Sequence, residues 1–312
     1  MRIAVAGIGA VGGYFGGKLA AAGVDTVFIA RGATLQALRS RGLRVDSING
    51  DFFVDDAHAT DNPSEVGIVD AIIFATKAWQ TPAAAEQVKP MIGPQTLAVP
   101  LQNGMDGPDQ LAQAFGREHA LGGLCGIVAF SVAPAQIRHA GIDPFVMFGE
   151  LDNSKSERVQ RLQKVFVDAG IKADVPQDIH RSMWSKFLFI APMSAIGALT
   201  RVPVGVWRAV PETRDIAVRA LREMIAVAAA RGVDVGADAI ERTLERYDGM
   251  PPESTSSLQR DVMEGKPSEL EAQAGAIVRM GREASVQTPV FDQLYALLLP
   301  QENKVRANMA RS

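Results

Sequence analysis

The sequence predicts an α/β protein, in which a doubly wound sheet at the N-terminus is followed by an all-α C-terminal domain. Three observations lead to this prediction. Apolar runs of strand length alternate with helical patterns as far as Val175. A glycine turn joins the first apolar run to the first helical pattern. Beyond Pro176 almost every segment has helical periodicity, so we expect domains of residues 1–177 and 178–312.

The first apolar run, Ile3 to Ala6, leads into a helical pattern that closes at Gly23. Strand, glycine turn and helix in this order are typical of a Rossmann-type dinucleotide-binding domain. The first glycine permits a tight turn, the second lets a pyrophosphate approach the backbone, and the third lets helix and strand pack closely. The predicted cofactor-binding turn consists of Gly7, Ile8, Gly9, Ala10, Val11 and Gly12. The alternative is a glycine-rich turn with no ligand.

The second strand, Thr26 to Ala30, ends at Arg31. NAD sites usually carry an acidic residue at that strand end, where it accepts a hydrogen bond from the ribose 2′-hydroxyl. Here the nearest acid, Asp25, precedes the strand, and an arginine suits a 2′-phosphate. The sequence therefore favours NADP (NADPH) over NAD, unless Arg31 is an ordinary surface residue.

The other elements of the first domain follow from apolar runs and turn residues. We expect a strand pair at residues 43–54, strands at 70–75 and 96–101, helices at 81–92 and 108–115, strands around 120–132, 136–139 and 145–149, and a helix at 156–169. We expect the strands at 136–139 and 145–149 to pair antiparallel.

The second domain is expected to contain five long helices and one short helix after the loop at residues 251–255. The long helices are expected at 178–199, 211–231, 237–248, 268–284 and 288–299. Ser256 or Ser257 would cap the short helix, and Ser268 with Glu271 is typical of a capping box. The polar tail from Gln301 is expected to fray.

Composition narrows the class of function. The net charge of −3, with scattered basic residues, predicts neither a nucleic-acid nor a membrane partner, and the apolar run at 187–200 is too short to span a bilayer. Cys125 is the single cysteine, as expected for a cytoplasmic protein. The four histidines lack ligand spacing, so we expect no metal. Apolar helices such as the one at 288–299 would suit a homodimer.

Four polar residues are candidates for chemistry. Lys77 and Asn103 follow strands at the sheet edge where ligands bind, although either residue alone also suits an ordinary loop. Lys186 shares a helix face with apolar residues, so we expect it to be largely buried, and a buried ammonium is a better proton donor. A lysine whose amine reaches water is the alternative. Glu269 lies in the first turn of a predicted helix. The helix dipole favours acidic residues there, so the position alone also suits a glutamate without a catalytic role.

Taken together, the motifs identify the chain as resembling the ketopantoate reductase (2-dehydropantoate 2-reductase) family. They occur in family order over nearly the whole chain: GIGAVG at 7–12, TKAWQT at 76–81, LQNGMDG at 101–107, SMWSKF at 182–187, STSSLQRDV at 254–262 and SELEA at 268–272. The resemblance implies an NADP-binding domain, a helical domain and a substrate in the cleft between them.

The resemblance also implies roles for particular residues. Lys186 matches the general acid that protonates the ketone oxygen, and Asn103 matches a residue that contacts both the nicotinamide ribose and the substrate. Glu269 matches a glutamate beside the reacting centre, where it would also contact the cofactor, and Lys77 matches a lysine on the cofactor side. Ser257 matches the serine that binds the substrate carboxylate.

Three positions depart from the family pattern. Ile190, Ser194 and Val204 stand where the family has asparagines that contact polar groups of the substrate. We expect Ile190 and Ser194 to line the substrate pocket with Lys186, because the three residues are four apart on one helix. An apolar wall discriminates weakly, so the pocket is expected to tolerate 2-oxoacids that lack the pantoate hydroxyl, and 2-dehydropantoate is then a poor or secondary substrate.

The leading hypothesis is NADPH-dependent reduction of a small 2-oxoacid, most simply 2-dehydropantoate to pantoate. One alternative is a reductase of the same family that acts on a less polar 2-oxoacid or ketone. Another is a non-catalytic NADP-binding sensor, which would have no need of a buried lysine.

Overall fold

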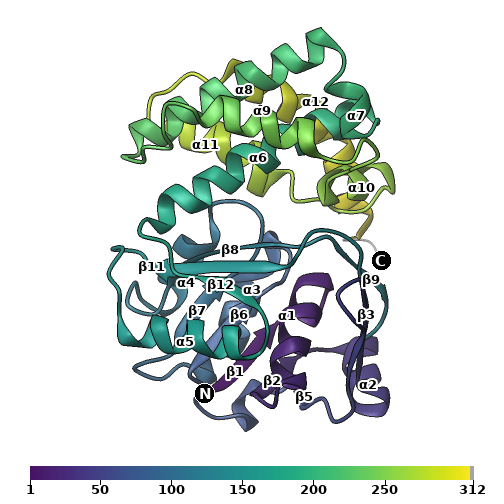
Figure 1. Ribbon diagram of the computed structural model, residues 1–312, viewed down its shortest axis with the longest axis vertical. Helices are drawn as coiled ribbons and strands as arrows, with labels where there is room; N and C mark the ends of the chain where they lie inside the picture. Colours follow the sequence, from purple (N-terminus) through teal and green to yellow (C-terminus); the bar gives the residue numbers. More distant parts are fainter. Residues whose placement is uncertain (310–312) are drawn as a thin grey trace. The chain divides into compact units, whose positions relative to one another are not determined.

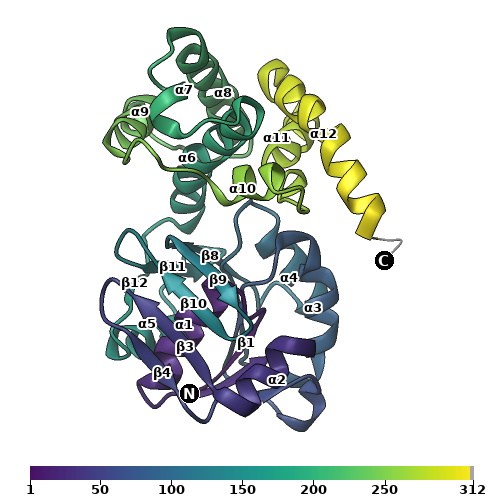
Figure 2. The ribbon, with the colours of Figure 1, turned by 90° about the vertical axis from the view of Figure 1, so that its right-hand side faces the viewer.

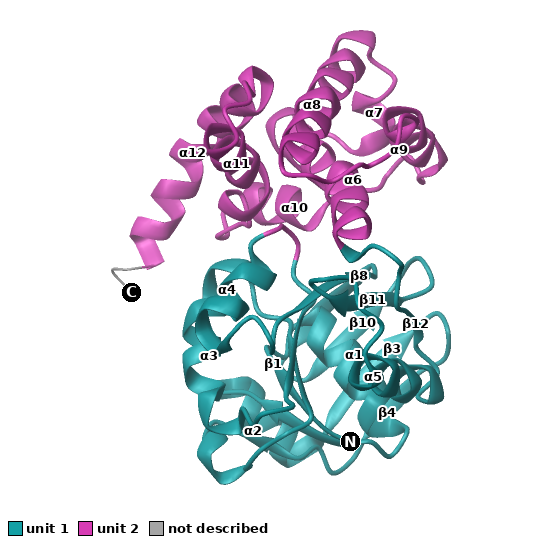
Figure 3. Ribbon diagram, turned by 90° about the vertical axis from the view of Figure 1, so that its left-hand side faces the viewer, with its two compact units in different colours: residues 1–102, 106–179 teal, residues 103–105, 180–312 magenta. Residues whose placement is uncertain are grey.

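The computed structural model describes residues 1–309. The chain divides into two compact units (Figure 3). Unit 1 comprises residues 1–102 and 106–179, and unit 2 comprises residues 103–105 and the chain from residue 180. Asn103 therefore belongs to unit 2, although the segments before and after the loop at 103–105 belong to unit 1.

A parallel five-stranded sheet forms the centre of unit 1, with strand order β5-β2-β1-β6-β7. Its strands are β1 (Arg2–Ala6), β2 (Asp25–Ile29), β5 (Ala59–Thr60), β6 (Ala71–Phe74) and β7 (Leu97–Pro100). The chain runs outward from β1 to β2 and β5, and then returns to place β6 on the other side of β1. The strand order thus reverses at β1, and ligands of doubly wound sheets bind at such a point.

Helices cover both faces of this sheet. Successive residues of a strand point to opposite faces, so each strand contributes side chains to the apolar core on either side. Ile3 and Val5 of β1 belong to the core beneath α1 (Ala10–Ala21) and α2 (Gly32–Arg41). Ala4 and Ala6 belong to the core beneath α3 (Thr81–Val88) and α4 (Gly107–Phe115). Figures 1 and 2 show these helices around the strands. The predicted doubly wound α/β fold is confirmed.

Two smaller sheets complete unit 1, together with α5 (Glu157–Asp168). One has the order β4-β3-β10-β9 and the other β12-β11-β8. Their strands are β3 (Leu43–Ser47), β4 (Phe52–Val54), β8 (Leu121–Gly126), β9 (Ala129–Ala133), β10 (Gln136–His139), β11 (Phe145–Glu150) and β12 (Lys172–Asp174). Short 3₁₀ turns occur at Pro63–Glu65, Ala78–Gln80 and Lys89–Met91.

The predicted antiparallel pairing of residues 136–139 with 145–149 is wrong. The apolar stretch expected as one strand around 120–132 is broken into β8 and β9, and each half pairs with a different strand. Thus β9 pairs with β10, and β8 pairs with β11, both antiparallel. The two strands that follow are therefore drawn into separate sheets.

Unit 2 is helical, as predicted. Its elements are α6 (Ile179–Thr200), α7 (Val204–Trp207), α8 (Pro211–Ala230), α9 (Ala239–Gly249), α10 (Ser257–Met263), a π-helical turn (Glu271–Gly275), α11 (Ala276–Glu283) and α12 (Pro289–Met309). From the apolar run at 187–200 we expected no segment long enough to span a bilayer. The helix α6 is longer than this run, and by length and composition it could cross a membrane. However, 67% of its most apolar 18-residue stretch is buried inside the protein. A helix at the centre of a helical core has the same property.

Two expectations for the C-terminal region are wrong. The chain does not fray from Gln301, because α12 continues to Met309 and the Glu302 side chain is 5% exposed. The capping box of Ser268 with Glu271 does not form. The hydroxyl of Ser268 donates to Glu302 instead, and Glu271 accepts hydrogen bonds from Arg279 and Tyr295.

Candidate active site

The glycine turn between β1 and α1 is shaped by close contacts. Gly7 has a φ of +96°, and a Cβ atom there would lie 2.6 Å from the Thr76 nitrogen. A Cβ atom on Gly12 would lie 2.0 Å from the Gly7 oxygen. Both positions therefore require glycine, so that the turn can be tight and α1 can pack closely on β1.

Gly9 is a glycine for a different reason. Its φ of −92° suits any residue, and a Cβ atom there would meet no protein atom within 4 Å. Neither backbone conformation nor packing requires glycine here, and the open space above Gly9 lets a ligand approach the backbone closely. The first turn of α1, which includes Ala10 and Val11, carries no acidic residue that would repel an anion. The turn thus fits a dinucleotide pyrophosphate.

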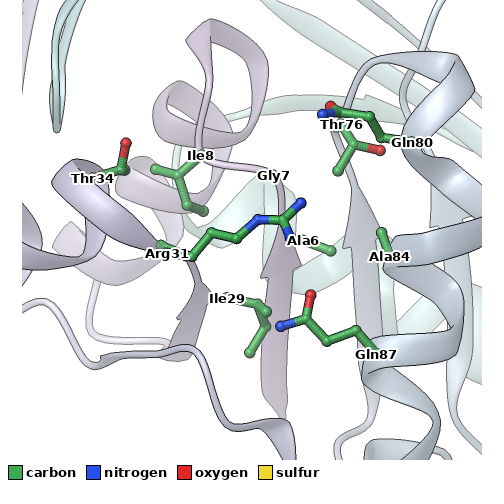
Figure 4. A pocket seen from close by; sticks show the side chains of 11 residues that line it. Ala6, Gly7, Ile8, Ile29, Arg31, Thr34, Thr76, Gln80, Ala84 and Gln87 are labelled. Atoms are coloured by element: carbon green, nitrogen blue, oxygen red, sulfur yellow. The ribbon is translucent and has the colours of Figure 1, made fainter. Parts of the chain in front are cut away.

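A pocket of about 190 Å³ adjoins this turn. Its lining comes from the ends of the sheet strands and from α2 and α3: Ala6, Gly7, Ile8, Ile29, Ala30, Arg31, Thr34, Thr76, Gln80, Ala84 and Gln87. In Figure 4 the Arg31 side chain extends from the end of β2 toward the middle of the pocket, between Ile8 and Thr34 on one side and Gln87 on the other. Among these lining residues Arg31 is the only charged one, so the pocket offers a cation and no carboxylate.

Asp25 lies at the opposite end of β2 from Arg31, where its carboxylate is 2.7 Å from the Arg2 Nε atom. It takes no part in the lining of the pocket. Lys77 follows Thr76 in sequence but is not among the lining residues, and its Nζ atom lies 5.9 Å from the centroid of the Trp79 ring. The structure thus brings Arg31 to the glycine turn and leaves Lys77 beside the pocket.

Two of the predicted site residues meet in unit 2. The Asn103 amide nitrogen lies 3.5 Å from the Glu269 carboxylate, although 166 positions separate them in the sequence. Glu269 is 6% exposed. The adjoining backbones are also close, because a Cβ atom on Gly104 would lie 2.5 Å from the Ala272 oxygen. The loop at 103–105 is therefore packed against the turn that follows Glu269.

Lys186, Ile190 and Ser194 lie along one stripe of α6. Lys186 is partly buried beside the buried residues Met183 and Phe187, and Ile190 is also partly buried. Ser194 is 0% exposed, and its hydroxyl oxygen has no hydrogen-bond partner among the described residues. An unpaired buried hydroxyl is unfavourable unless another group satisfies it, so Ser194 is a candidate ligand contact.

Ser257 is the first residue of α10 and is partly buried. The capping role falls to Ser256, whose hydroxyl accepts a hydrogen bond from the Gln259 backbone at 3.0 Å. Ser257 is therefore not needed as a cap. One turn further on, Arg260 donates to the carbonyl and hydroxyl oxygens of Thr255, and burial lowers the pKa of its guanidinium. A cation that is poorly solvated in this way favours a nearby anion.

Sequence reasoning missed several residues that line the pocket in unit 1. Thr76 and Gln80 lie inside the TKAWQT motif, which could have indicated them. Thr34 and Gln87 face the pocket from helical positions that no local pattern distinguishes. The unpaired state of the Ser194 hydroxyl likewise depends on tertiary packing and has no sequence signal.

The glycine turn and its pocket are typical of a dinucleotide-binding domain, and the match to known proteins shows the reaction class. Family models described as "Ketopantoate reductase PanE/ApbA" and its "C terminal" counterpart match residues 3–153 and 178–302. The chain is thus an oxidoreductase that uses a pyridine nucleotide. It belongs to the ketopantoate reductase family, as the motifs predicted.

Relatives match over nearly the whole chain. An "Uncharacterized oxidoreductase YkpB" from Bacillus subtilis is 31% identical over 96% of this chain and 98% of its own. A 2-dehydropantoate 2-reductase from Mesorhizobium japonicum is 30% identical over 96% and 97%. The crystal structure of 2-dehydropantoate 2-reductase from Geobacter metallireducens has a TM-score of 0.90 at 29% identity, covering 96% of this chain and 99% of that one.

Proposed function

We propose that the protein catalyses NADPH-dependent reduction of a small 2-oxoacid to the 2-hydroxyacid, most simply 2-dehydropantoate to pantoate. The observation that carries this proposal is the approach of Asn103 to Glu269 across 166 positions of sequence. The family resemblance assigns both residues to the reacting centre, and a shared site is the simplest reason for two such residues to meet.

In this proposal the chain's own residues hold the substrate and supply a proton. The bound dinucleotide supplies the hydride. The Lys186 ammonium gives its proton to the ketone oxygen as the hydride arrives, so the product is the hydroxyl compound and the lysine is left neutral until it takes a proton from solvent. Asn103 and Glu269 orient the reacting groups, and Ser257 binds the substrate carboxylate.

The preference for NADPH over NADH rests on charge. A 2′-phosphate near Arg31 would form a charge-assisted hydrogen bond. The carboxylate that usually accepts from the 2′-hydroxyl of NADH is missing among the residues that line the pocket, and Asp25 is paired with Arg2 instead. In this arrangement Arg31 attracts the 2′-phosphate, and no carboxylate among the lining residues repels it. Lys77 would contact the cofactor from beside the pocket.

A second candidate substrate class is favoured by Ile190. This residue is partly exposed on the stripe of Lys186, where it adds apolar surface in place of the family's asparagine. A less polar 2-oxoacid or ketone would then be reduced by the same chemistry. We expect either reaction to take place in the cytoplasm.

The test is NADPH oxidation by the purified protein with a panel of 2-oxoacids that includes 2-dehydropantoate and 2-oxoisovalerate. Turnover of at least one acid supports the proposal, and faster turnover with NADPH than with NADH supports the cofactor assignment. If the protein binds NADPH but turns over none of the panel, the proposed reduction of a 2-oxoacid is wrong.

A further inference from the structure

Gln273 is a fully buried amide without a partner. Its side chain is 0% exposed, and neither its nitrogen nor its oxygen makes a hydrogen bond within the part of the chain that the structure describes. Burial of one unsatisfied polar atom is already costly, and here both ends of the amide are unsatisfied. An apolar side chain would fill the same place at no such cost, so the amide needs another explanation.

The position of Gln273 points to the substrate site. Its backbone N–H donates to the Glu269 carbonyl at 3.0 Å, so Gln273 lies one helical turn beyond Glu269 and on the same side. The residue before it, Ala272, packs against Gly104, next to Asn103. Gln273 is thus connected through its own turn to both residues of the Asn103–Glu269 pair.

The backbone around Gln273 is also unusual. Residues Glu271–Gly275 form a π-helical turn, in which the Gly275 N–H donates to the Leu270 carbonyl at 3.0 Å. Such turns are rare and occur frequently at functional sites, because the extra residue redirects side chains. The turn and the unpaired amide are independent observations, and both point to a ligand contact here.

We propose that Gln273 is a specificity-determining residue, whose amide hydrogen-bonds a hydroxyl on the side chain of the 2-oxoacid. An amide both donates and accepts, so it suits a hydroxyl, which does the same. Gln273 thereby supplies polar groups that the apolar Ile190 side chain on α6 does not offer, and the unpaired Ser194 hydroxyl provides a second polar group. This inference rests on the proposed 2-oxoacid reduction.

The test compares two substrates that differ in this hydroxyl, 2-dehydropantoate and 2-oxoisovalerate, in the wild type and in Gln273→Met. Methionine keeps the length of the side chain and removes the hydrogen bonds. We expect kcat/KM for 2-dehydropantoate to fall about three- to tenfold, as for the removal of one hydrogen bond, and kcat/KM for 2-oxoisovalerate to stay within about twofold. The matched control is Gln110→Met in unit 1, where a buried amide oxygen also lacks a partner among residues 1–309, and it should leave the ratio unchanged.

Thermal unfolding of the substrate-free protein gives a second measurement. Gln273→Met should raise Tm, because it removes an unpaired buried amide. An unchanged substrate ratio, or an equal decrease for both acids, would overturn the role of Gln273, and so would a lower Tm. A wild type that reduces neither acid would instead overturn the proposed function, so the two failures are distinguishable.

Discussion

Arg31 brings the only charge to the lining of the pocket beside the glycine turn, and it therefore provides a direct test of cofactor choice. One charge-assisted hydrogen bond contributes about 1.5–3 kcal/mol, so Arg31→Ala should weaken NADPH binding about tenfold to a hundredfold. NADH binding should barely change. The control is Arg41→Ala, an exposed residue at the other end of α2. Equal losses of affinity for both cofactors in a binding titration would show that Arg31 does not recognise the 2′-phosphate.

Lys186 is the proposed proton donor, and its substitution should affect the chemical step. General acid catalysis contributes typically about 10²–10⁴-fold, so Lys186→Ala should lower kcat by that order while NADPH still binds. Lys186→Arg should not rescue activity, because a guanidinium keeps its proton. Lys304→Ala, at an exposed position of α12, serves as the control. Near-normal turnover in Lys186→Ala would mean that another group supplies the proton.

At the scale of elements, the C-terminal turns of α12 are tied to the segment that carries Glu269. The buried Glu302 carboxylate accepts from the Ser268 backbone at 3.1 Å and from the Ser268 hydroxyl at 2.6 Å. It also pairs with Arg306 at 2.7 Å. Ser268 immediately precedes Glu269 in sequence, so α12 helps to hold that residue in place.

Removal of the Glu302 carboxylate should therefore destabilise the protein. Glu302→Ala would leave the Ser268 donors buried and unsatisfied, at a cost of about 2–4 kcal/mol in the free energy of unfolding. Asp292→Ala on the same helix should cost less than about 1 kcal/mol, because its contact with Arg282 is 3.8 Å long and exposed. Denaturant unfolding measures both values. A decrease below about 1 kcal/mol in Glu302→Ala would mean that the end of α12 contributes little to stability.

The sequence predicted those elements whose signals are local. The first strand, turn and helix follow from glycine spacing and apolar periodicity, and Ser256 caps α10 as one of the two candidates expected there. Errors arose where a distant residue decides the outcome. Glu302 looked like part of a polar tail, yet it is buried and accepts a hydrogen bond from Ser268, 34 positions away. The partners of β10 and β11 likewise depend on where β8 ends and β9 begins.

At the scale of the whole molecule, the family motifs predicted candidate site residues but not how the fold groups them. Asn103 follows a strand of unit 1 in sequence, yet it belongs to unit 2 and meets Glu269 there. Lys186 was expected to be largely buried and is only partly buried, since periodicity shows which face a residue occupies but not how deeply it lies. Gln273 was not predicted, because an unpaired amide is defined by its three-dimensional surroundings.

In the proposed reaction, we expect these groups together to decide substrate choice. The stripe of α6 presents Ile190 and the small Ser194 hydroxyl, while Gln273 adds a single amide. A site built to hydrogen-bond a substrate hydroxyl discriminates about 10⁴–10⁵-fold against an analogue without it, whereas one added hydrogen bond gives about tenfold or less. We therefore expect any preference of the wild type for 2-dehydropantoate over 2-oxoisovalerate to be less than about a hundredfold.

Introducing the family's asparagines should increase the preference for 2-dehydropantoate over 2-oxoisovalerate. Ile190→Asn replaces apolar surface by two donors and an acceptor, and Ile190→Asn with Ser194→Asn adds a second amide. The ratio of kcat/KM for the two acids should rise in the single variant and rise further in the double variant. Ser194 is 0% exposed, so the larger asparagine side chain there could destabilise the protein. Tm is therefore measured for both variants. If the double variant unfolds, the single variant provides the test. A wild-type preference well above about a hundredfold would mean that the site is built to recognise the substrate hydroxyl, contrary to this prediction. A ratio that Ile190→Asn leaves unchanged would mean that this stripe of α6 does not face the substrate.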